Sequence, residues 1–504
     1  MQEKGLEPSQ CCHRQILSLM RLPIPPLLHI FNSSPCVDYV SLAYCILNCN
    51  NLINYFLVLH YLYIIEEEMY MWANESVFYQ IYPLGFCGAP FENYGKLEHR
   101  LLHVLDFIPH MKKLGVNAIY FSPLFESDTH GYNTRDYHRI DKRLGDAKDM
   151  KLVCDTLHKE GFKIILDGVF NHVGRGFTKF QDVLKYREKS PYADWFYISF
   201  DGDNDYHDGL WYEGWEGHYD LVRLNLKNPF VVDYLCETVL DWISDYDIDG
   251  LRLDVAYLLE PSFLERLRRD TKEWKQDFFL VGETLFGDYN RIMNDRMCHS
   301  VTNYECYKGI YSSFNSHNLF EINHSLIRQF GSDPWCLYQG KHLLNFLDNH
   351  DVSRIISTID DTNQVPLAYV LLFTMPGIPI VYYGSEWGEP GEKCNGDPSL
   401  RPYIEKPEWN GLTDLVARLA RIFRSQSALQ YGSFRSVALT NQACAYAREY
   451  NDEKILVCIN ESNQEQTLHF QEGTEGTNLL TNETMAISGG ITLPPYMGYI
   501  LKIN

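Results

Sequence analysis

Basic residues are scarce in this chain relative to acidic ones. The 504 residues include 44 Lys and Arg but 66 Asp and Glu, which gives a formal net charge of -22. Proteins that bind nucleic acid or anionic lipid surfaces need basic patches. The shortage therefore argues against nucleic acid and membrane-surface partners. It favours a soluble enzyme that acts on an uncharged substrate.

The chain also lacks the evenly spaced cysteines of a disulfide-rich secreted protein. Its 14 cysteines form no paired framework, and several, such as Cys154, Cys236 and Cys458, lie inside apolar runs. Such residues behave as small reduced hydrophobes, so we expect a reducing compartment and predict a cytoplasmic protein. There is no CxxC pair with a second ligand pair, which argues against structural zinc.

Residues 1–68 lack the charged region, apolar core and small-residue cleavage site of a signal peptide. The stretch 52–65 is strongly apolar, but asparagines interrupt the longer run around it, and a membrane helix needs about 20 mostly apolar residues. Three interpretations stay open: an over-long translation with the true start at Met69 or Met71, a membrane anchor, or a structured extension. Because barrel-like patterning begins directly afterwards, the first is favoured. A chain that starts at Met69 is expected to fold and to be active.

From Val77 onward, short apolar runs alternate with stretches of helical periodicity. A segment such as 149–160 repeats its apolar residues every three or four positions and is followed by Gly161, which is typical of a helix end. Eight runs alternating with helices predict an α/β fold, the (β/α)8 TIM barrel. The expected strands are 77–83, 118–123, 163–171, 249–256, 278–284, 301–307, 343–351 and 378–386.

Two segments depart from this rhythm and define the expected domains. The catalytic barrel is predicted over 69–424, with a small inserted domain after strand three at about 173–220, and an antiparallel β-sandwich domain over 425–504. Aromatic residues make up 14% of the chain. In the insertion, Trp195, Trp211 and Trp215 are candidates for stacking against sugars, although packing within a small irregular subdomain is the favoured explanation for any one of them.

Three acidic residues close three of the apolar runs. Asp254 follows GLRL, Glu283 follows FFLVG and Asp351 ends LLNFLDNHD. The end of a buried strand is an unfavourable place for a charge, because desolvation disfavours the ionised form. A single such residue is most often a cap or an ion pair. Three in order predict one site at the carboxyl ends of the barrel strands, where barrel enzymes carry their chemistry.

Several short motifs occur in order from Val77 to the end of the chain, most of them at a strand end. Any one is weak, but together they make the chain similar to the α-amylase family of glycoside hydrolases. LVRLN further resembles the maltodextrin-degrading, neopullulanase-like branch of that family. The motifs are SPLFES, HGYNTRDY, DGVFNH, LVRLN, GLRLDVA, GET, NHD and GIPIVYYGSEWG followed by DPSLR.

The resemblance implies a role for each acidic residue. Asp254 matches the nucleophile, Glu283 the general acid/base and Asp351 the carboxylate that stabilises the transition state. Retaining glycosidases pass through a covalent glycosyl-enzyme intermediate, and their two reacting carboxyl groups lie about 5–5.5 Å apart. Glu283 must be protonated and Asp254 ionised for this reaction, and Arg252 on the same strand face is expected to keep Asp254 charged.

The resemblance also implies a set of residues that bind the sugar. Tyr132 matches the platform under the reacting ring, and the two histidines match the pair that hydrogen-bonds this ring. An acid and an arginine match the pair that holds the next sugar, while Asp167 belongs to the strand-three motif. The expected substrate-binding residues are Tyr132, His172, Arg252, His350, Asp397 and Arg401.

No cofactor is required by this chemistry, and calcium is left open. Asn171 fits one ligand of the calcium site found in many family members, but Leu258 stands where many relatives have a histidine. The expected substrate is an α-1,4-linked maltodextrin or another α-glucan oligosaccharide, and the oligomeric state is not predicted. Two alternatives stay open: a transglycosylase that uses the same intermediate, and a membrane-anchored amylase-like subunit without catalysis, which the three acids argue against.

Overall fold

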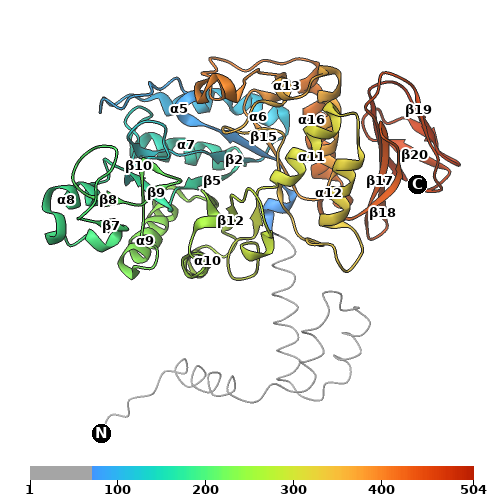
Figure 1. The fold of residues 1–504 in the computed structure, drawn as a ribbon. Helices are drawn as coiled ribbons and strands as arrows, with labels where there is room; N and C mark the ends of the chain where they lie inside the picture. The colour runs from blue at the N-terminus through green and yellow to red at the C-terminus, as the bar shows by residue number, and fades with distance from the viewer. Residues whose placement is uncertain (1–70, 504) are drawn as a thin grey trace, which may run out of the picture. The chain divides into compact units, whose positions relative to one another are not determined.

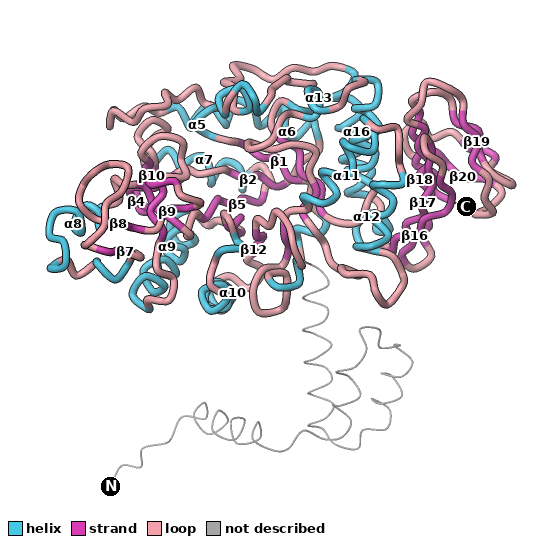
Figure 2. Tube along the Cα trace, in the orientation of Figure 1, coloured by secondary structure: helices cyan, strands magenta, loops and turns pink. Residues whose placement is uncertain are grey.

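The computed structural model describes residues 71–503, so the interpretations of residues 1–68 lie outside the described residues. Within this range, no helix combines the length and the apolar character that crossing a membrane requires. The elements are shown in Figure 1, and Figure 2 distinguishes helices from strands.

Eight parallel strands form a barrel, which confirms the predicted fold class. A bridge between Thr302 and Leu344 joins the two ends of the sheet, and the backbone N–H of Asn303 donates to the Leu344 carbonyl at 2.9 Å. The eight strands follow chain order around the barrel. They are β1 (Phe78–Ile81), β2 (Ala118–Phe121), β5 (Lys163–Gly168), β11 (Gly250–Leu253), β12 (Phe279–Gly282), β13 (Ser300–Val301), β14 (Leu344–Asn345) and β15 (Ile378–Tyr382).

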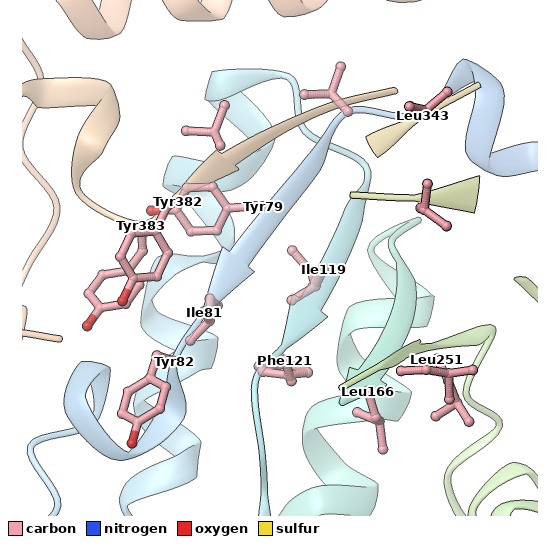
Figure 3. Packing of buried hydrophobic residues seen from close by; sticks show 14 of the residues in the cluster. Tyr79, Ile81, Tyr82, Ile119, Phe121, Leu166, Leu251, Leu343, Tyr382 and Tyr383 are labelled. Carbon is pink, nitrogen blue, oxygen red and sulfur yellow. The ribbon is translucent and has the colours of Figure 1, made fainter. Parts of the chain in front are cut away.

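Side chains of each strand alternate between the barrel interior and the helix layer. On β2, Ala118 and Tyr120 belong to an interior cluster, whereas Ile119 and Phe121 belong to the larger cluster under the helices. Figure 3 shows Ile119 and Phe121 together with Leu251 of β11 in that outer layer. The neighbouring residue Arg252 therefore faces the interior, the side on which a site can form.

Helices pack around the barrel, and a side chain caps the start of α7 (Ala147–Lys159), α9 (Pro229–Tyr246), α11 (Tyr304–Asn315) and α16 (Gly411–Ser425). The helix α7 starts with a capping box made by Asp146 and Asp149. Residues 100–114 form a 3-10 helix (Arg100–Phe107) followed directly by α6 (Ile108–Leu114), with Pro109 in the first turn of α6. The remaining barrel helices are α5 (Pro83–Phe86), α10 (Pro261–Trp274), α12 (Phe320–Phe330), α13 (Ile355–Thr358), α14 (Val365–Thr374), α15 (Asp397–Leu400) and α17 (Ser427–Tyr431).

The sixth and seventh strands are shorter than the sequence predicts. Strand β13 ends at Val301 because Asn303 caps the next helix, its side chain accepting a hydrogen bond from the Cys306 N–H at 3.2 Å. Strand β14 comprises only Leu344 and Asn345, and the rest of the apolar run 343–351 continues as buried loop. The segments that follow these two strands therefore begin earlier in the chain than expected.

A small excursion follows the third barrel strand. In it β6 (His172–Gly174) pairs with β10 (His218–Arg223), which pairs with β9 (Gly214–Trp215), and β7 (Ile198–Ser199) pairs with β8 (Trp211–Tyr212). The helix α8 (Thr178–Tyr186) lies between β6 and β7 in the sequence. Earlier in the chain, β3 (Phe125–Ser127) and β4 (Thr134–Ile140) form a hairpin that carries the HGY motif in its turn.

The C-terminal part consists of antiparallel strands, as expected. Six strands pair in the order β16-β17-β18-β23-β20-β21, and β19 pairs with β22. Their shared apolar core includes Leu456, Leu468 and Leu493. The bounds are β16 (Ser433–Leu439), β17 (Ala443–Tyr450), β18 (Glu453–Asn460), β19 (Gln466–Leu468), β20 (Glu475–Asn478), β21 (Thr484–Ala486), β22 (Ile491–Leu493) and β23 (Met497–Ile503).

Candidate active site

The three predicted acids lie beyond the carboxyl ends of three barrel strands. Asp254 follows β11 directly, Glu283 follows β12, and Asp351 lies in the loop after β14. Since all strands of the barrel are parallel, these ends meet at one face. Asp254 and Glu283 are buried, while the side chain of Asp351 keeps 36% of its surface exposed.

One guanidinium group joins the first two acids. Nη1 of Arg252 lies 2.9 Å from Oδ1 of Asp254, and Nη2 lies 2.7 Å from Oε1 of Glu283. The second oxygen of Glu283 accepts a hydrogen bond from the Val255 backbone N–H at 2.9 Å. The carboxyl groups of Asp254 and Glu283 therefore both contact the side chain of Arg252. This brings them close together, as two reacting carboxyl groups must be.

Burial governs the protonation of this pair. Desolvation raises the pKa of Asp254 well above its ordinary value; Arg252 opposes this shift, and the charge of Glu283 adds to it. Burial therefore outweighs Arg252, contrary to the sequence-based expectation that Arg252 decides the charge of Asp254.

A third carboxylate fixes the position of the arginine. Asp167, at the end of β5, accepts from Nη1 of Arg252 at 2.8 and 3.0 Å. Its Oδ2 also accepts from the hydroxyls of Tyr120 at 2.7 Å and Tyr132 at 3.0 Å. The contacts with Asp167 fix the guanidinium of Arg252, so its remaining donors point to Asp254 and Glu283 in a fixed direction.

Tyr132 and His350 face each other across the site. Their rings are stacked, with centroids 5.4 Å apart and planes inclined by 6°, and the Tyr132 hydroxyl contacts Nε2 of His350. The side-chain amide of Gln80 lies 2.8 Å from Nδ1 of His350. With Nδ1 assigned as the acceptor from this amide, Nε2 carries the proton and points toward Asp351, 2.9 Å away.

Asp351 is held in its charged form by the groups around it. Burial alone would raise its pKa, but His350, Arg401 and Arg252 together bring it below the ordinary value. Nη2 of Arg401 lies 2.9 Å from Asp351 and 3.0 Å from Asp397. The predicted pair of Asp397 and Arg401 is thus in contact, and its arginine is shared with the site.

His172 presents a donor without a partner in the described structure. Its Nε2 is buried and unpaired, 3.9 Å from Oδ2 of Asp254, while the amide of Asn171 lies 3.2 Å from Nδ1. Burial lowers the pKa of His172 to about 3, so the ring is neutral. A neutral histidine with a free Nε2–H beside a reacting carboxyl can bind a sugar hydroxyl.

The calcium site suggested by Asn171 finds no support among its neighbours. Within residues 71–503, no group of three or more His, Cys, Asp or Glu side chains is arranged to hold a metal ion. Calcium takes six to eight oxygen ligands, and in Asn171 it is the amide nitrogen that lies 3.2 Å from Nδ1 of His172. The calcium site suggested by Asn171 therefore stays a prediction.

Sequence reasoning missed two parts of the site. The Tyr304 hydroxyl lies 3.4 Å from Oε1 of Glu283 and accepts from the Asn349 amide at 3.2 Å. Val255 adopts φ 44°, a left-handed conformation that a β-branched residue rarely takes and that directs its N–H to Glu283. Tyr304 had been assigned to a strand, and a valine gives no sequence signal for such a turn.

The tryptophans of the insertion divide between core and surface. Trp195 is 7% exposed within the core cluster, so packing explains it, while Trp211 is 41% exposed. Trp215 lies beside His172, with ring centroids 6.0 Å apart, and its buried Nε1 has no partner in the described structure. Of the three candidates, only Trp215 contacts a residue of the site.

Known proteins match the chain over both of its folded parts. The family model for the α-amylase catalytic domain matches residues 80–410, and the model for the maltogenic amylase C-terminal domain matches residues 434–500. A cyclomaltodextrinase of Thermoanaerobacter pseudethanolicus is 32% identical over 88% of this chain and 80% of its own length. Neopullulanase 2 of Thermoactinomyces vulgaris is 33% identical over 88% of this chain and 81% of its own length.

Solved structures agree with these matches. The ligand-free cyclic α-maltosyl-(1→6)-maltose hydrolase from Arthrobacter globiformis superimposes with a TM-score of 0.75 at 27% identity. The match covers 86% of this chain and all of that one. Catalytic-domain match, relatives and barrel thus lead to the same conclusion: the chain belongs to the α-amylase family of glycoside hydrolases.

Proposed function

We propose that this enzyme cleaves α-1,4-glucosidic bonds of maltodextrins with retention of configuration. The observation that carries the proposal is the sharing of Arg252 between Asp254 and Glu283. Relatives of this chain are a cyclomaltodextrinase and a neopullulanase, whose names point to the same substrate class. Retaining hydrolysis needs two neighbouring carboxyl groups, one of them protonated.

The reaction needs a proton on Glu283 and an ionised Asp254. Glu283 donates this proton to the glucosidic oxygen, the bond from that oxygen to the anomeric carbon breaks, and Asp254 forms the covalent glycosyl ester. Glu283, now ionised, takes a proton from water, whose oxygen attacks the anomeric carbon and releases Asp254. Asp351 stays charged throughout and stabilises the positive charge that develops on the ring.

The remaining residues position the reacting sugar. Tyr132 supplies a flat ring beneath it, and the unpaired Nε2–H of His172 is available to its hydroxyls, while Nε2 of His350 lies beside Asp351. Arg401 and Asp397 extend from Asp351 to the next sugar toward the non-reducing end. Each of these groups is held by a contact that does not involve substrate, so the site is arranged before binding.

We place the enzyme in the cytoplasm. The nine cysteines within residues 71–503 are all free, seven of them buried, which suits a reducing compartment. One relative, from Bacillus subtilis, is named an intracellular maltogenic amylase.

Incubation with maltotriose and longer maltooligosaccharides tests the proposed reaction. Shorter products whose new reducing end first appears as the α-anomer by NMR are expected, and the Glu283→Gln protein should form almost none. Products longer than the substrate would identify a transglycosylase with the same intermediate. A folded enzyme that cleaves no α-glucan would overturn the proposal and favour a non-catalytic role.

A further inference from the structure

Two hollows adjoin the loop 284–288, which follows Glu283 at the end of β12. The larger, of about 740 Å³, lies against α11 and α12, and the smaller, of about 470 Å³, is lined by Phe286 and Arg328. Both volumes fall in the range of about 300–1,000 Å³ that is usual for ligand sites. The reaction described above uses neither of them.

Both hollows share walls with the catalytic site. Leu285 and Glu305 line the two hollows together. Tyr304 lines the larger one, and its hydroxyl lies 3.4 Å from Oε1 of Glu283. Phe286 lines the smaller one and packs against Tyr257, three residues after Asp254, with ring centroids 5.6 Å apart. The larger hollow therefore reaches a side chain that contacts Glu283, and the smaller one reaches a side chain that contacts Tyr257.

Their position identifies the end of the substrate that would reach them. The reacting ring is bound on the side of Asp351 and Arg401, whereas Tyr304 and Tyr257 flank Glu283. Glu283 protonates the leaving oxygen, so the leaving part of the substrate lies on its side. The hydroxyl of Tyr257 is buried without a partner in the described structure, which leaves a donor for a ligand hydroxyl at this point.

The lining suits a neutral sugar rather than an ion. Lys308 pairs with Glu321, and Arg328 pairs with Glu305 at 2.5 Å, so neither cation is left to attract an anion. Two aromatic rings are open to solvent: Phe286 is 71% exposed and Phe320 is 47% exposed. Flat apolar rings beside paired polar groups match the apolar faces and hydroxyl edges of glucose units.

We propose that the two hollows bind the leaving-group end of a long or branched α-glucan, beyond the sugars next to the bond that is cut. The inference rests on the proposed function, because that function defines which end leaves. It assigns to Phe286 and Phe320 a share in selecting substrate length. Long chains gain contacts there that a trisaccharide cannot reach.

The test compares kcat/KM for maltoheptaose with kcat/KM for maltotriose. Phe320→Ala is expected to lower this ratio about tenfold, which corresponds to the loss of one good aromatic contact, and Phe286→Ala should lower it as well. Phe230→Ala removes an equally open aromatic ring, 69% exposed at the start of α9, and should leave the ratio as it is. Circular dichroism shows that each variant is folded.

Equilibrium binding of maltoheptaose to the Glu283→Gln protein separates this inference from the proposed function. Adding Phe320→Ala to that protein should weaken binding about tenfold without any need for turnover. If Phe320→Ala weakens binding but the enzyme without substitutions cleaves no glucan, the hollows are supported as a sugar site and the proposed reaction is refuted. Unchanged ratios and unchanged affinity in both phenylalanine variants would overturn the inference.

Discussion

At the scale of single residues, the site depends on one buried cation that holds three carboxylates. Arg252 contacts Asp167, Asp254 and Glu283 within 3.0 Å. Without it, three acids would share a desolvated space with no counter-charge, and removal of one partner from a buried ion pair is strongly destabilising. We therefore expect Arg252 to contribute to the stability of the barrel as well as to the proposed reaction.

Replacing this cation should cost stability in a pH-dependent way. Arg252→Met is expected to lower the free energy of unfolding by about 3–5 kcal/mol at pH 7 and to abolish activity. The loss should shrink toward pH 4, because the orphaned carboxyls then take up protons. Urea unfolding at the two pH values measures the difference, and a loss that is equal at both would contradict the electrostatic explanation. Arg252→Lys, which keeps the charge, serves as the control and should lose less stability.

Asp254 illustrates a conflict between function and stability. Burial raises its pKa in the folded protein above the value in the unfolded chain, so the folded state loses stability as pH rises through the window above about 3.9. Asp254→Asn removes this cost. We expect it to be inactive but about 1–2 kcal/mol more stable at pH 7, with no gain near pH 3. Denaturant unfolding measures both values, and a destabilised Asp254→Asn protein at pH 7 would refute the sign.

How far these residues could be read from sequence depends on what fixes each one. Asp254, Glu283 and Asp351 were predictable because a charge after a buried strand is costly and needs a reason. Tyr304 and the turn at Val255 were not, since their roles come from contacts with other strands. The raised pKa of Asp254 could not be foreseen from sequence either, because burial on all sides is a property of the whole barrel.

At the scale of elements, the eight strands were predictable and their ends were not. Apolar runs mark every barrel strand, but the sixth run stops at Val301 because Asn303 caps α11. The cap depends on a single residue, but the apolar pattern of the sequence continues past it. The apolar pattern alone therefore does not show where the strand ends. The segments that follow these strands carry the site. An error of a few residues at a predicted strand end therefore assigns a functional residue to a strand when it lies in a loop or a helix.

One short helix shows how closely elements must approach to form the site. Gly85 lies in α5, and a Cβ built there would come within 2.1 Å of the Arg401 carbonyl oxygen. Gly85→Ala must therefore displace the backbone that carries the partner of Asp351. We expect a loss of about 1–3 kcal/mol in stability, as for other overpacked sites, and at least a tenfold fall in kcat/KM.

The matched control is Gly411→Ala at the start of α16, where a new Cβ meets nothing within 4 Å. This variant should keep both activity and stability. Activity assays on maltooligosaccharides and thermal unfolding measure the two effects. If Gly85→Ala behaved like Gly411→Ala, the close approach to Arg401 would not be what positions that arginine.

At the scale of the whole described molecule, the barrel and the antiparallel C-terminal sheet are joined through a buried interface. Tyr446 of β17 is buried and its hydroxyl lies 2.5 Å from Oγ1 of Thr374, at the end of α14. The guanidinium of Arg448, on the same strand, donates to the Thr374 carbonyl at 2.7 Å. Apolar residues of both parts belong to one core cluster, which includes Val370 of α14 and Val457 of β18.

This shared core predicts that the two parts unfold together. All nine tryptophans lie between Trp72 and Trp409, so tryptophan fluorescence reports the barrel alone. Tyr446→Ala removes a buried ring of the sheet and should cost about 3–5 kcal/mol. If unfolding is cooperative, the fluorescence midpoint falls by the same amount as the far-UV circular dichroism midpoint, although no tryptophan lies in the sheet. A fluorescence transition that stays in place while the sheet melts earlier would show two independent units, and the sheet would then have no part in holding the barrel and its site in shape.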